Sequence, residues 1–264
     1  MKYKLVASDM DGTLLGSDSL LPEGNVQAVA YCTEKGVKFV LCTGRPVQAI
    51  MPHYRRLNLD TPVISYNGGR ITDPVTGCVL YRKCLDDESV ESILSLAREK
   101  DAVACVWADD KLYINKTTPI SVRYAELAVT EPVAYDLENV SFKGKNVDKI
   151  LWTHTAEETE LLVEFIEGRC PGNVSCFTST PEYIEFVNRE VSKGEALKKL
   201  CEIMGIEVCE SVAFGDGEND IELLKAAGLG VAMENAVEKV KKAADLITVS
   251  NDELGVAKVI YEVI

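Results

Sequence analysis

Two aspartates, Asp9 and Asp11, stand one residue apart directly after the apolar residues 5–7. A carboxylate can attack an electrophile, exchange a proton or hold a hard cation, so a close pair can divide these tasks. The ordinary alternative is a polar strand end that leads into a turn, since Gly12 and Thr13 follow at once. The chain holds 42 Asp and Glu residues, so this triplet does not decide the question alone.

Three further stretches place polar residues after or beside apolar segments: LCTGRP, SVAFGDGEND and NREVSKGEALKKL. Each has a structural alternative, namely a helix cap with a turn, a solvated loop, and a capping box in which Ser192 pairs with Glu195. The residues in them that could bind a ligand are Thr43, Gly44, Lys193, Asp216, Asn219 and Asp220. Lys193 is the hardest to explain structurally. A cation in the first turn of a helix opposes the helix dipole, and a nearby anion would account for it.

Together these residues indicate phosphoryl transfer. Asp9, Asp11 and Asp216 offer the oxygen ligands that Mg²⁺ prefers. Thr43, the Gly44 N–H and Lys193 offer hydrogen-bond donors and a positive charge for a phosphoryl group. Hydrolysis of phosphate monoesters requires rate enhancements of up to ~10²¹-fold, which explains why a nucleophile, an acid, a metal and a cation would occur together.

The elements that would position these residues alternate along the chain. Apolar strands at 5–7, 37–42 and 62–66 alternate with amphipathic helices at 22–36 and 46–57. The same alternation returns near the C-terminus, with helices at 193–204, 218–227, 236–243 and up to Ile264, and strands at 211–215, 230–233 and 246–249. This pattern predicts an α/β fold with a parallel sheet covered on both faces. The carboxyl ends of its strands share one edge, where ligands bind.

The middle of the chain reads as a separate α+β domain, inserted at roughly 83–187 after a hairpin-like stretch at 68–83. Its predicted helices lie at 86–100, 119–128 and 156–169, and its predicted strands flank residues 108–111 and occupy 149–154, 174–179 and 183–187. The catalytic domain would then consist of residues 1–82 and 188–264.

Composition excludes several classes of partner. The 264-residue chain has a formal net charge of −14, which disfavours nucleic acid and anionic membranes as partners. Nine cysteines without a CxxC pair indicate reduced thiols, and no apolar run is long enough for a bilayer or a secretory leader. We therefore expect a cytoplasmic protein that acts on a small molecule; its oligomeric state stays open.

The stretches DMDGT, TGR, SKG and GDGEND, in this order, resemble the four motifs of the haloacid dehalogenase (HAD) superfamily. The insertion between the second and third motifs resembles the Cof-type subclass (IIB) with a C2 cap, as do SYNGG and VAMENA. The resemblance covers the core, 1–82 and 188–264, and implies a Rossmann-like three-layer sheet. Glu190 and Glu234 depart from it, because glycine is common at these positions.

This resemblance also implies roles for individual residues. Asp9 would be the nucleophile that becomes an aspartyl-phosphate, and Asp11 would protonate the leaving alcohol and then activate water. Asp9, the backbone carbonyl of Asp11, and Asp216 would hold Mg²⁺, with Asp220 supporting them. The phosphate would be bound by Thr43, Gly44, Lys193 and Asn219. Apart from the resemblance, Arg45 is a candidate for binding the rest of the substrate.

The expected protein is a magnesium-dependent phosphatase of small phosphorylated metabolites, above all sugar phosphates. A sugar phosphomutase and a phosphate-binding regulatory protein without turnover are the alternatives. A role like that of a P-type ATPase is disfavoured, because those proteins carry Thr instead of Asp11 and require membrane helices.

Overall fold

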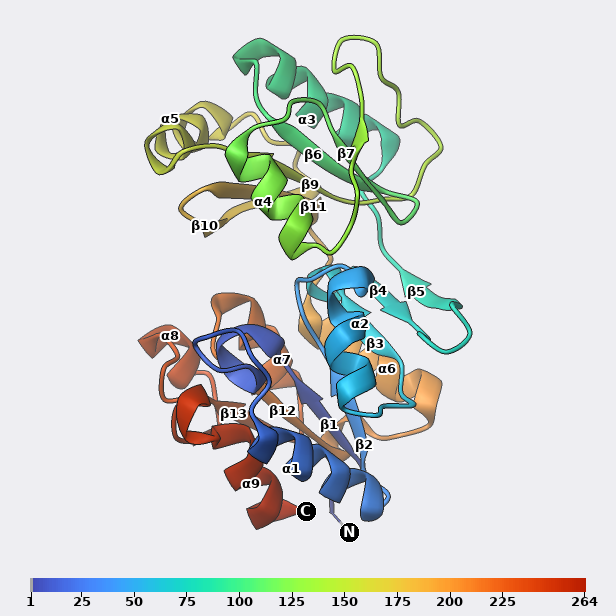
Figure 1. The fold of residues 1–264 in the computed structure, drawn as a ribbon, viewed down its shortest axis with the longest axis vertical. Helices are drawn as coiled ribbons and strands as arrows, with labels where there is room; N and C mark the ends of the chain where they lie inside the picture. Colours follow the sequence, from blue (N-terminus) through green and yellow to red (C-terminus); the bar gives the residue numbers. More distant parts are fainter. Residues whose placement is uncertain (1) are drawn as a thin grey trace. The chain divides into compact units, whose positions relative to one another are not determined.

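The computed structural model describes residues 2–264, which divide into two compact units. The first unit contains the residues up to Tyr81 together with Ser192–Ile264, and the second contains Arg82–Val191 (Figure 1). The insertion predicted at 83–187 lies inside the second unit. That unit extends further, because its last strand ends at Asn188 and the turn after it continues to Val191.

A five-stranded sheet forms the centre of the first unit, with the order β14-β13-β12-β1-β2 and parallel pairing throughout. Its strands are β1 (Leu5–Ser8), β2 (Lys38–Leu41), β12 (Ser211–Gly215), β13 (Leu229–Ala232) and β14 (Leu246–Ile247). Ala7 of β1 lies opposite Val40 of β2 on one side and Ala213 of β12 on the other, so the N-terminal and C-terminal parts of the chain meet at β1. The predicted parallel sheet is confirmed.

Helices cover both faces of this sheet, as predicted. The helices of this unit are α1 (Glu23–Glu34), α2 (Val47–Arg56), α6 (Lys193–Met204), α7 (Ile221–Ala226), α8 (Glu238–Lys241) and α9 (Gly255–Val263). Val6 packs into a cluster with residues of α1, α2 and α9, whereas its neighbours Leu5 and Ala7 pack into a second cluster with α6, α7 and α8. Successive side chains of a strand point to opposite faces, so β1 is apolar on both.

Two helices near the C-terminus are shorter than the sequence suggested. The segment predicted as a helix at 218–227 begins with a separate 3₁₀ turn, Glu218–Asp220, before α7. The Asp220 carboxylate accepts the backbone N–H groups of Asp216 and Gly217, which shapes this turn. The helix predicted at 236–243 is reduced to α8.

A small antiparallel sheet follows β2 in the chain. It contains β3 (Val63–Ser65), β4 (Arg70–Thr72) and β5 (Val79–Arg82), in that order. Ile64 forms a parallel bridge with Cys42, so β3 continues the line of the main sheet beyond β2. The 3₁₀ turn Tyr66–Gly68 directly after β3 therefore lies at the same edge as the ends of the parallel strands.

The second unit has its own six-stranded sheet, with the order β10-β11-β9-β6-β7-β8. Its strands are β6 (Ala104–Ala108), β7 (Lys111–Ile114), β8 (Val133–Ala134), β9 (Val147–Thr153), β10 (Val174–Thr180) and β11 (Tyr183–Asn188). Its helices are α3 (Asp87–Lys100), α4 (Pro119–Leu127) and α5 (Ala156–Ile166). The short strand β8 was not predicted; it pairs with β7 in parallel.

Within residues 2–264, no helix has both the length and the apolar content needed to cross a bilayer.

The hydrophobic core of the second unit generates a stability prediction. Trp152 is fully buried and its ring lies 5.1 Å from that of Phe186. We expect Trp152→Ala to lower the free energy of unfolding by about 3–5 kcal/mol, because the cavity cannot fully collapse. Leu161→Ala on α5 is the control, since Leu161 is 69% exposed and its loss should change stability by roughly 0.5 kcal/mol or less. Equal urea midpoints for the two variants would contradict this assignment of the core.

Candidate active site

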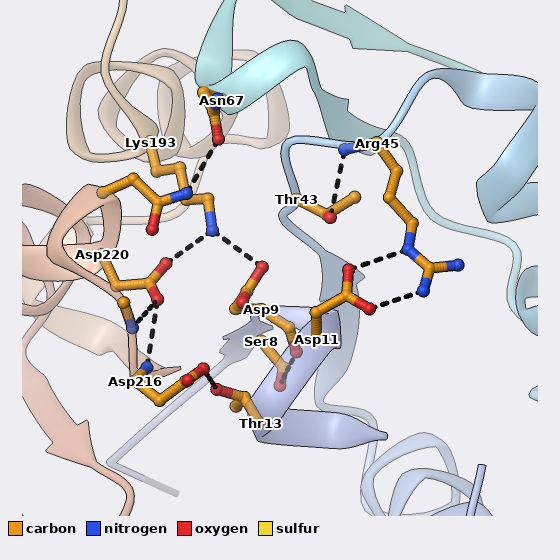
Figure 2. Close-up of polar contacts among 12 residues, drawn as sticks. Ser8, Asp9, Asp11, Thr13, Thr43, Arg45, Asn67, Lys193, Asp216 and Asp220 are labelled. Atoms are coloured by element: carbon orange, nitrogen blue, oxygen red, sulfur yellow. Dashed lines mark hydrogen bonds and ion pairs between the residues drawn. The ribbon is translucent and has the colours of Figure 1, made fainter. Parts of the chain in front are cut away.

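The structure brings the four polar stretches together at the carboxyl ends of β1, β2 and β12, beside the start of α6 (Figure 2). Asp9 directly follows β1, and its backbone N–H donates to the Phe214 carbonyl of β12 at 3.0 Å. Thr43 follows β2, and its backbone N–H donates to the Ile64 carbonyl of β3 at 3.0 Å. The order of the strands in the sheet, not their order in the chain, makes these residues neighbours.

Lys193 lies between two carboxylates at the centre of this group. Its Nζ is 2.7 Å from Asp9 Oδ1 and 2.6 Å from Asp220 Oδ1, and the side chain is completely buried. Burial opposes the charge, but the Asp220 and Asp9 carboxylates outweigh it and raise the pKa of Lys193 above its ordinary value. The anion expected beside this cation is thus a pair of carboxylates from the chain itself.

The helix start that carries Lys193 is capped on one side. The Ser192 hydroxyl accepts the Glu195 N–H at 3.0 Å, as expected of a cap. The reciprocal bond from the Glu195 side chain to the Ser192 backbone, which would complete the expected capping box, is not among the contacts of the described residues. Glu195 instead forms an ion pair with Lys198.

Asp220 connects Lys193 to the loop that carries Asp216. One carboxylate oxygen of Asp220 binds Lys193, and the other accepts the N–H groups of Asp216 and Gly217 at 3.0 and 2.9 Å. The Asp216 carboxylate in turn accepts the Thr13 hydroxyl at 2.7 Å. Thr13 was not singled out from the sequence, although it is the last residue of the DMDGT motif.

Asp9, Asp216 and Asp220 form a cluster that could hold a divalent cation. One carboxylate oxygen from each lies within 4.8 Å of the other two. An all-oxygen donor set with several negative charges fits a hard cation such as Mg²⁺ and does not fit a soft metal. Asp220 was expected to support the site from behind, and the structure places its carboxylate in the cluster itself.

Burial disfavours the ionised forms of two carboxyl groups in this cluster. It raises the pKa of Asp9 to about 8, despite the opposing effect of Lys193, and the pKa of Asp216 to about 6, despite the hydrogen bond from Thr13. The negative charge of Asp220 contributes to both shifts. A bound cation would favour the ionised carboxylates and so counteract these shifts.

The Asp11 carboxylate lies outside this cluster. It forms a two-bond ion pair with Arg45, with Nε to Oδ2 at 2.8 Å and a terminal nitrogen to Oδ1 at 2.5 Å. The Asp11 side chain is 54% exposed. Its side chain therefore contacts Arg45 and not the cluster, and a contribution of its backbone carbonyl to a metal stays a prediction.

The expected phosphate-binding residues come from three segments. Thr43 is buried and its hydroxyl accepts the Arg45 N–H at 3.2 Å, which fixes the turn that contains Gly44. The Asn219 amide donates to Asn67 Oδ1 at 2.9 Å. Asn67 was not assigned a role from the sequence; the signal was the SYNGG stretch, which was noted only as a family feature.

The raised pKa values predict how a cation should affect stability. A carboxyl whose folded pKa exceeds its ordinary value of 3.8 stabilises the folded state at low pH. That contribution is lost as the pH rises towards about 6 for Asp216 and about 8 for Asp9. A divalent cation would bind the ionised forms, so the stabilising effect of added Mg²⁺ on the melting temperature should grow between pH 5 and pH 8.

Melting curves in Mg²⁺ and in EDTA at both pH values measure this effect, since the difference between them cancels the titration of distant groups. Asp216→Asn should reduce the difference, while Asp252→Asn, at an exposed position, should leave it unchanged. An equal effect of Mg²⁺ at the two pH values would contradict the raised pKa values.

Comparisons with known proteins identify the family of this chain. Residues 6–260 match the family model described as haloacid dehalogenase-like hydrolase. A solved haloacid dehalogenase-like hydrolase from Bacteroides thetaiotaomicron is 31% identical, with a TM-score of 0.89 over 99% of this chain and 100% of that one. The pyridoxal phosphate phosphatase of Escherichia coli (strain K12) is 29% identical over 99% of this chain and 98% of its own length. A solved sugar phosphatase of HAD subclass IIB is 26% identical, with a TM-score of 0.83 over 98% of each chain.

The match spans both units of the chain. The likeness to solved structures covers nearly the whole length of this chain, so it includes the inserted unit as well as the catalytic core. The family expected from the four motifs is therefore confirmed. The chain belongs to the haloacid dehalogenase-like hydrolase family, and its activity is that of a phosphoric monoester hydrolase.

Proposed function

We propose that this protein is a magnesium-dependent phosphatase that hydrolyses small phosphorylated metabolites, above all sugar phosphates, through an aspartyl-phosphate on Asp9. The observation that supports it most is the buried Lys193, held between Asp9 and Asp220 with Asp216 alongside. This arrangement combines a nucleophile, a fixed cation and a set of metal ligands at one edge of the sheet. A regulatory phosphate-binding protein would not need the nucleophile and its acid together.

In the first step, a carboxylate oxygen of Asp9 attacks the phosphorus and the bond to the ester oxygen breaks. Asp11 gives its proton to that oxygen, so the alcohol leaves as a neutral molecule. Lys193 and the donors at Thr43, Gly44 and Asn219 stabilise the charge on the phosphoryl oxygens. These donors are fixed before the substrate arrives, so little reorganisation is required during the reaction.

In the second step, the ionised Asp11 takes a proton from water, and the water oxygen attacks the phosphorus of the aspartyl-phosphate. The bond to Asp9 breaks, phosphate leaves and both aspartates return to their starting states. Asp11 is ion-paired with Arg45 in the free protein, so Arg45 has to release this carboxyl before it can act on the ester oxygen. We expect an anionic or hydroxyl group of the substrate to draw Arg45 away, so that Asp11 can carry a proton.

Asp9 and Asp216 would hold Mg²⁺, together with the backbone carbonyl of Asp11. When bound, the ion supplies positive charge that reduces the repulsion between the Asp9 carboxylate and the phosphate dianion. Asp220 either joins them directly or keeps Lys193 and the Asp216 loop in place, and its hydrogen bonds support the second role.

The similarities to two phosphatases bear on the class of substrate. The similarity to a subclass IIB sugar phosphatase supports sugar phosphates, whereas the similarity to a pyridoxal phosphate phosphatase supports phosphorylated vitamins. A panel that contains both classes, together with nucleotides, would rank them by kcat/KM.

The cytoplasm is the proposed compartment; all nine cysteines lie in the described residues 2–264 and are free thiols, which agrees with a reducing environment.

Metal dependence is the first test of this function. Hydrolysis of p-nitrophenyl phosphate should fall to background in excess EDTA and return when Mg²⁺ exceeds the chelator. Phosphate should be released from a sugar monophosphate without any bisphosphate activator, which distinguishes a phosphatase from a phosphomutase. Full activity in EDTA would refute the role of the carboxylate cluster.

The roles of the two opening aspartates can be separated by substitution. Asp9→Asn keeps the shape of the side chain but removes the nucleophile, so no phosphoryl-enzyme should form. Asp11→Asn should lower kcat by about 10²–10⁴-fold for alkyl phosphates and by less for aryl phosphates, whose leaving groups need less protonation. Aspartyl-phosphate should accumulate on Asp9 in this variant, because the water is no longer activated.

Rapid quenching after a pulse of labelled substrate measures both effects. Label on the Asp9→Asn protein would overturn the assignment of the nucleophile. An equal defect of Asp11→Asn with aryl and alkyl phosphates would overturn the assignment of the acid.

A further inference from the structure

The 3₁₀ turn Tyr66–Gly68 has an unusual backbone conformation. Its three residues, which follow β3 directly, have φ angles of 53°, 58° and 101°. A left-handed conformation is tolerated by Asn and Gly but is uncommon for a bulky residue such as Tyr66. Such conformations persist where the surroundings impose them, and they concentrate at functional sites. All three residues are buried.

The turn is bound to the loop that follows β2. The Asn67 N–H donates to the Thr43 carbonyl at 3.1 Å, and the Tyr66 N–H donates to the Arg45 carbonyl at 3.3 Å. Gly44, between these two acceptors, lies against the Asn67 amide, where an added Cβ would be 2.7 Å from Asn67 Oδ1. The side chain of Asn67 therefore occupies the space that a larger residue at position 44 would need.

The same turn contacts the two other phosphate-binding segments. Asn67 Oδ1 accepts the amide N–H of Asn219, in the loop after β12, at 2.9 Å. Gly68 touches the start of α6, where an added Cβ would lie 2.2 Å from the Ser192 carbonyl oxygen and 2.9 Å from the Lys193 nitrogen. One turn of three residues thus joins the segments of Thr43, Lys193 and Asn219.

We propose that Asn67 is a positioning residue of the phosphate site, which holds the Asn219 amide in the orientation that phosphate binding requires. An amide nitrogen has two N–H groups; the bond to Asn67 uses one and leaves the other for a phosphate oxygen. A side chain that is fixed before binding does not lose rotamer freedom when the ligand arrives. This inference rests on the proposed function, since it takes Asn219 as a phosphate ligand.

A double-mutant cycle with Asn219 separates this role from a general contribution to folding. Asn67→Gly removes the amide but tolerates the left-handed backbone. We expect it to weaken binding of inorganic phosphate, and to lower kcat/KM for p-nitrophenyl phosphate, by about tenfold, the value of one well-placed hydrogen bond. In the Asn219→Ala background the same change should have almost no further effect, because its partner is already absent.

Asn58→Gly is the matched control, because Asn58 also has a left-handed backbone, with φ of 51°, but is exposed after α2, outside the site. It should leave both phosphate affinity and kcat/KM unchanged. Urea midpoints of all variants verify that they are folded. If Asn67→Gly does not fold, Asn67→Ser gives the same cycle, since it also removes the amide and a serine of this chain, Ser19, adopts a φ of 61°.

An equal loss from Asn67→Gly in the two backgrounds, or no loss in either, would overturn the positioning role. Measurements of phosphate binding and of turnover on the wild-type protein distinguish a failure of this inference from a failure of the proposed function. A wild-type protein that binds phosphate without hydrolysing esters would refute the proposed function, while the cycle on phosphate affinity would still decide the role of Asn67. A wild-type protein that binds no phosphate would refute both.

Discussion

Lys193 carries a charge in a place that water does not reach, and a buried cation is stable only where opposite charges compensate it. Asp9 and Asp220 provide this compensation from segments that precede and follow Lys193 in the chain. Removing one partner of such a group typically costs about 3–5 kcal/mol, since the remaining charge is left unpaired. The same contacts that stabilise Lys193 therefore hold Asp9, the proposed nucleophile, and the Asp216 loop in place, so stability and the proposed chemistry depend on one group of side chains.

The parallel sheet makes this group possible. β1 lies between β2 and β12, which places the ends of three strands next to each other although about 170 residues separate β2 from β12 in the chain. Both faces of β1 pack against helices, so a shift of β1 by one residue would exchange its two apolar faces and displace Asp9. The register of the sheet thus fixes the position of Asp9 relative to the neighbouring strand ends. The turn Tyr66–Gly68 contacts the segments of Thr43, Lys193 and Asn219 and so fixes their positions as well.

The two aspartates proposed as nucleophile and acid lie in different environments. Asp9 is buried beside Lys193, whereas Asp11 is half exposed and ion-paired with Arg45. A nucleophile needs a constant geometry, because it forms and breaks the same bond in each turnover. The acid must gain and lose a proton, which requires access to water and a partner that can move away. One strand end supplies both environments within three residues.

The sequence by itself determined the kinds and order of the elements, since apolar periodicity, caps and breakers act over a few residues, and the ordered motifs indicated Asp9, Thr43, Lys193 and Asp216. The helix predicted at 218–227 begins later in the structure, because the Asp220 carboxylate accepts two backbone N–H groups and shapes a separate turn before α7. Only the tertiary structure decided that Lys193 is buried, that Asp11 pairs with Arg45 and that Asn67 reaches Asn219 across 152 positions of sequence. These contacts depend on where distant backbone segments meet, and local sequence preferences carry no information about such distances.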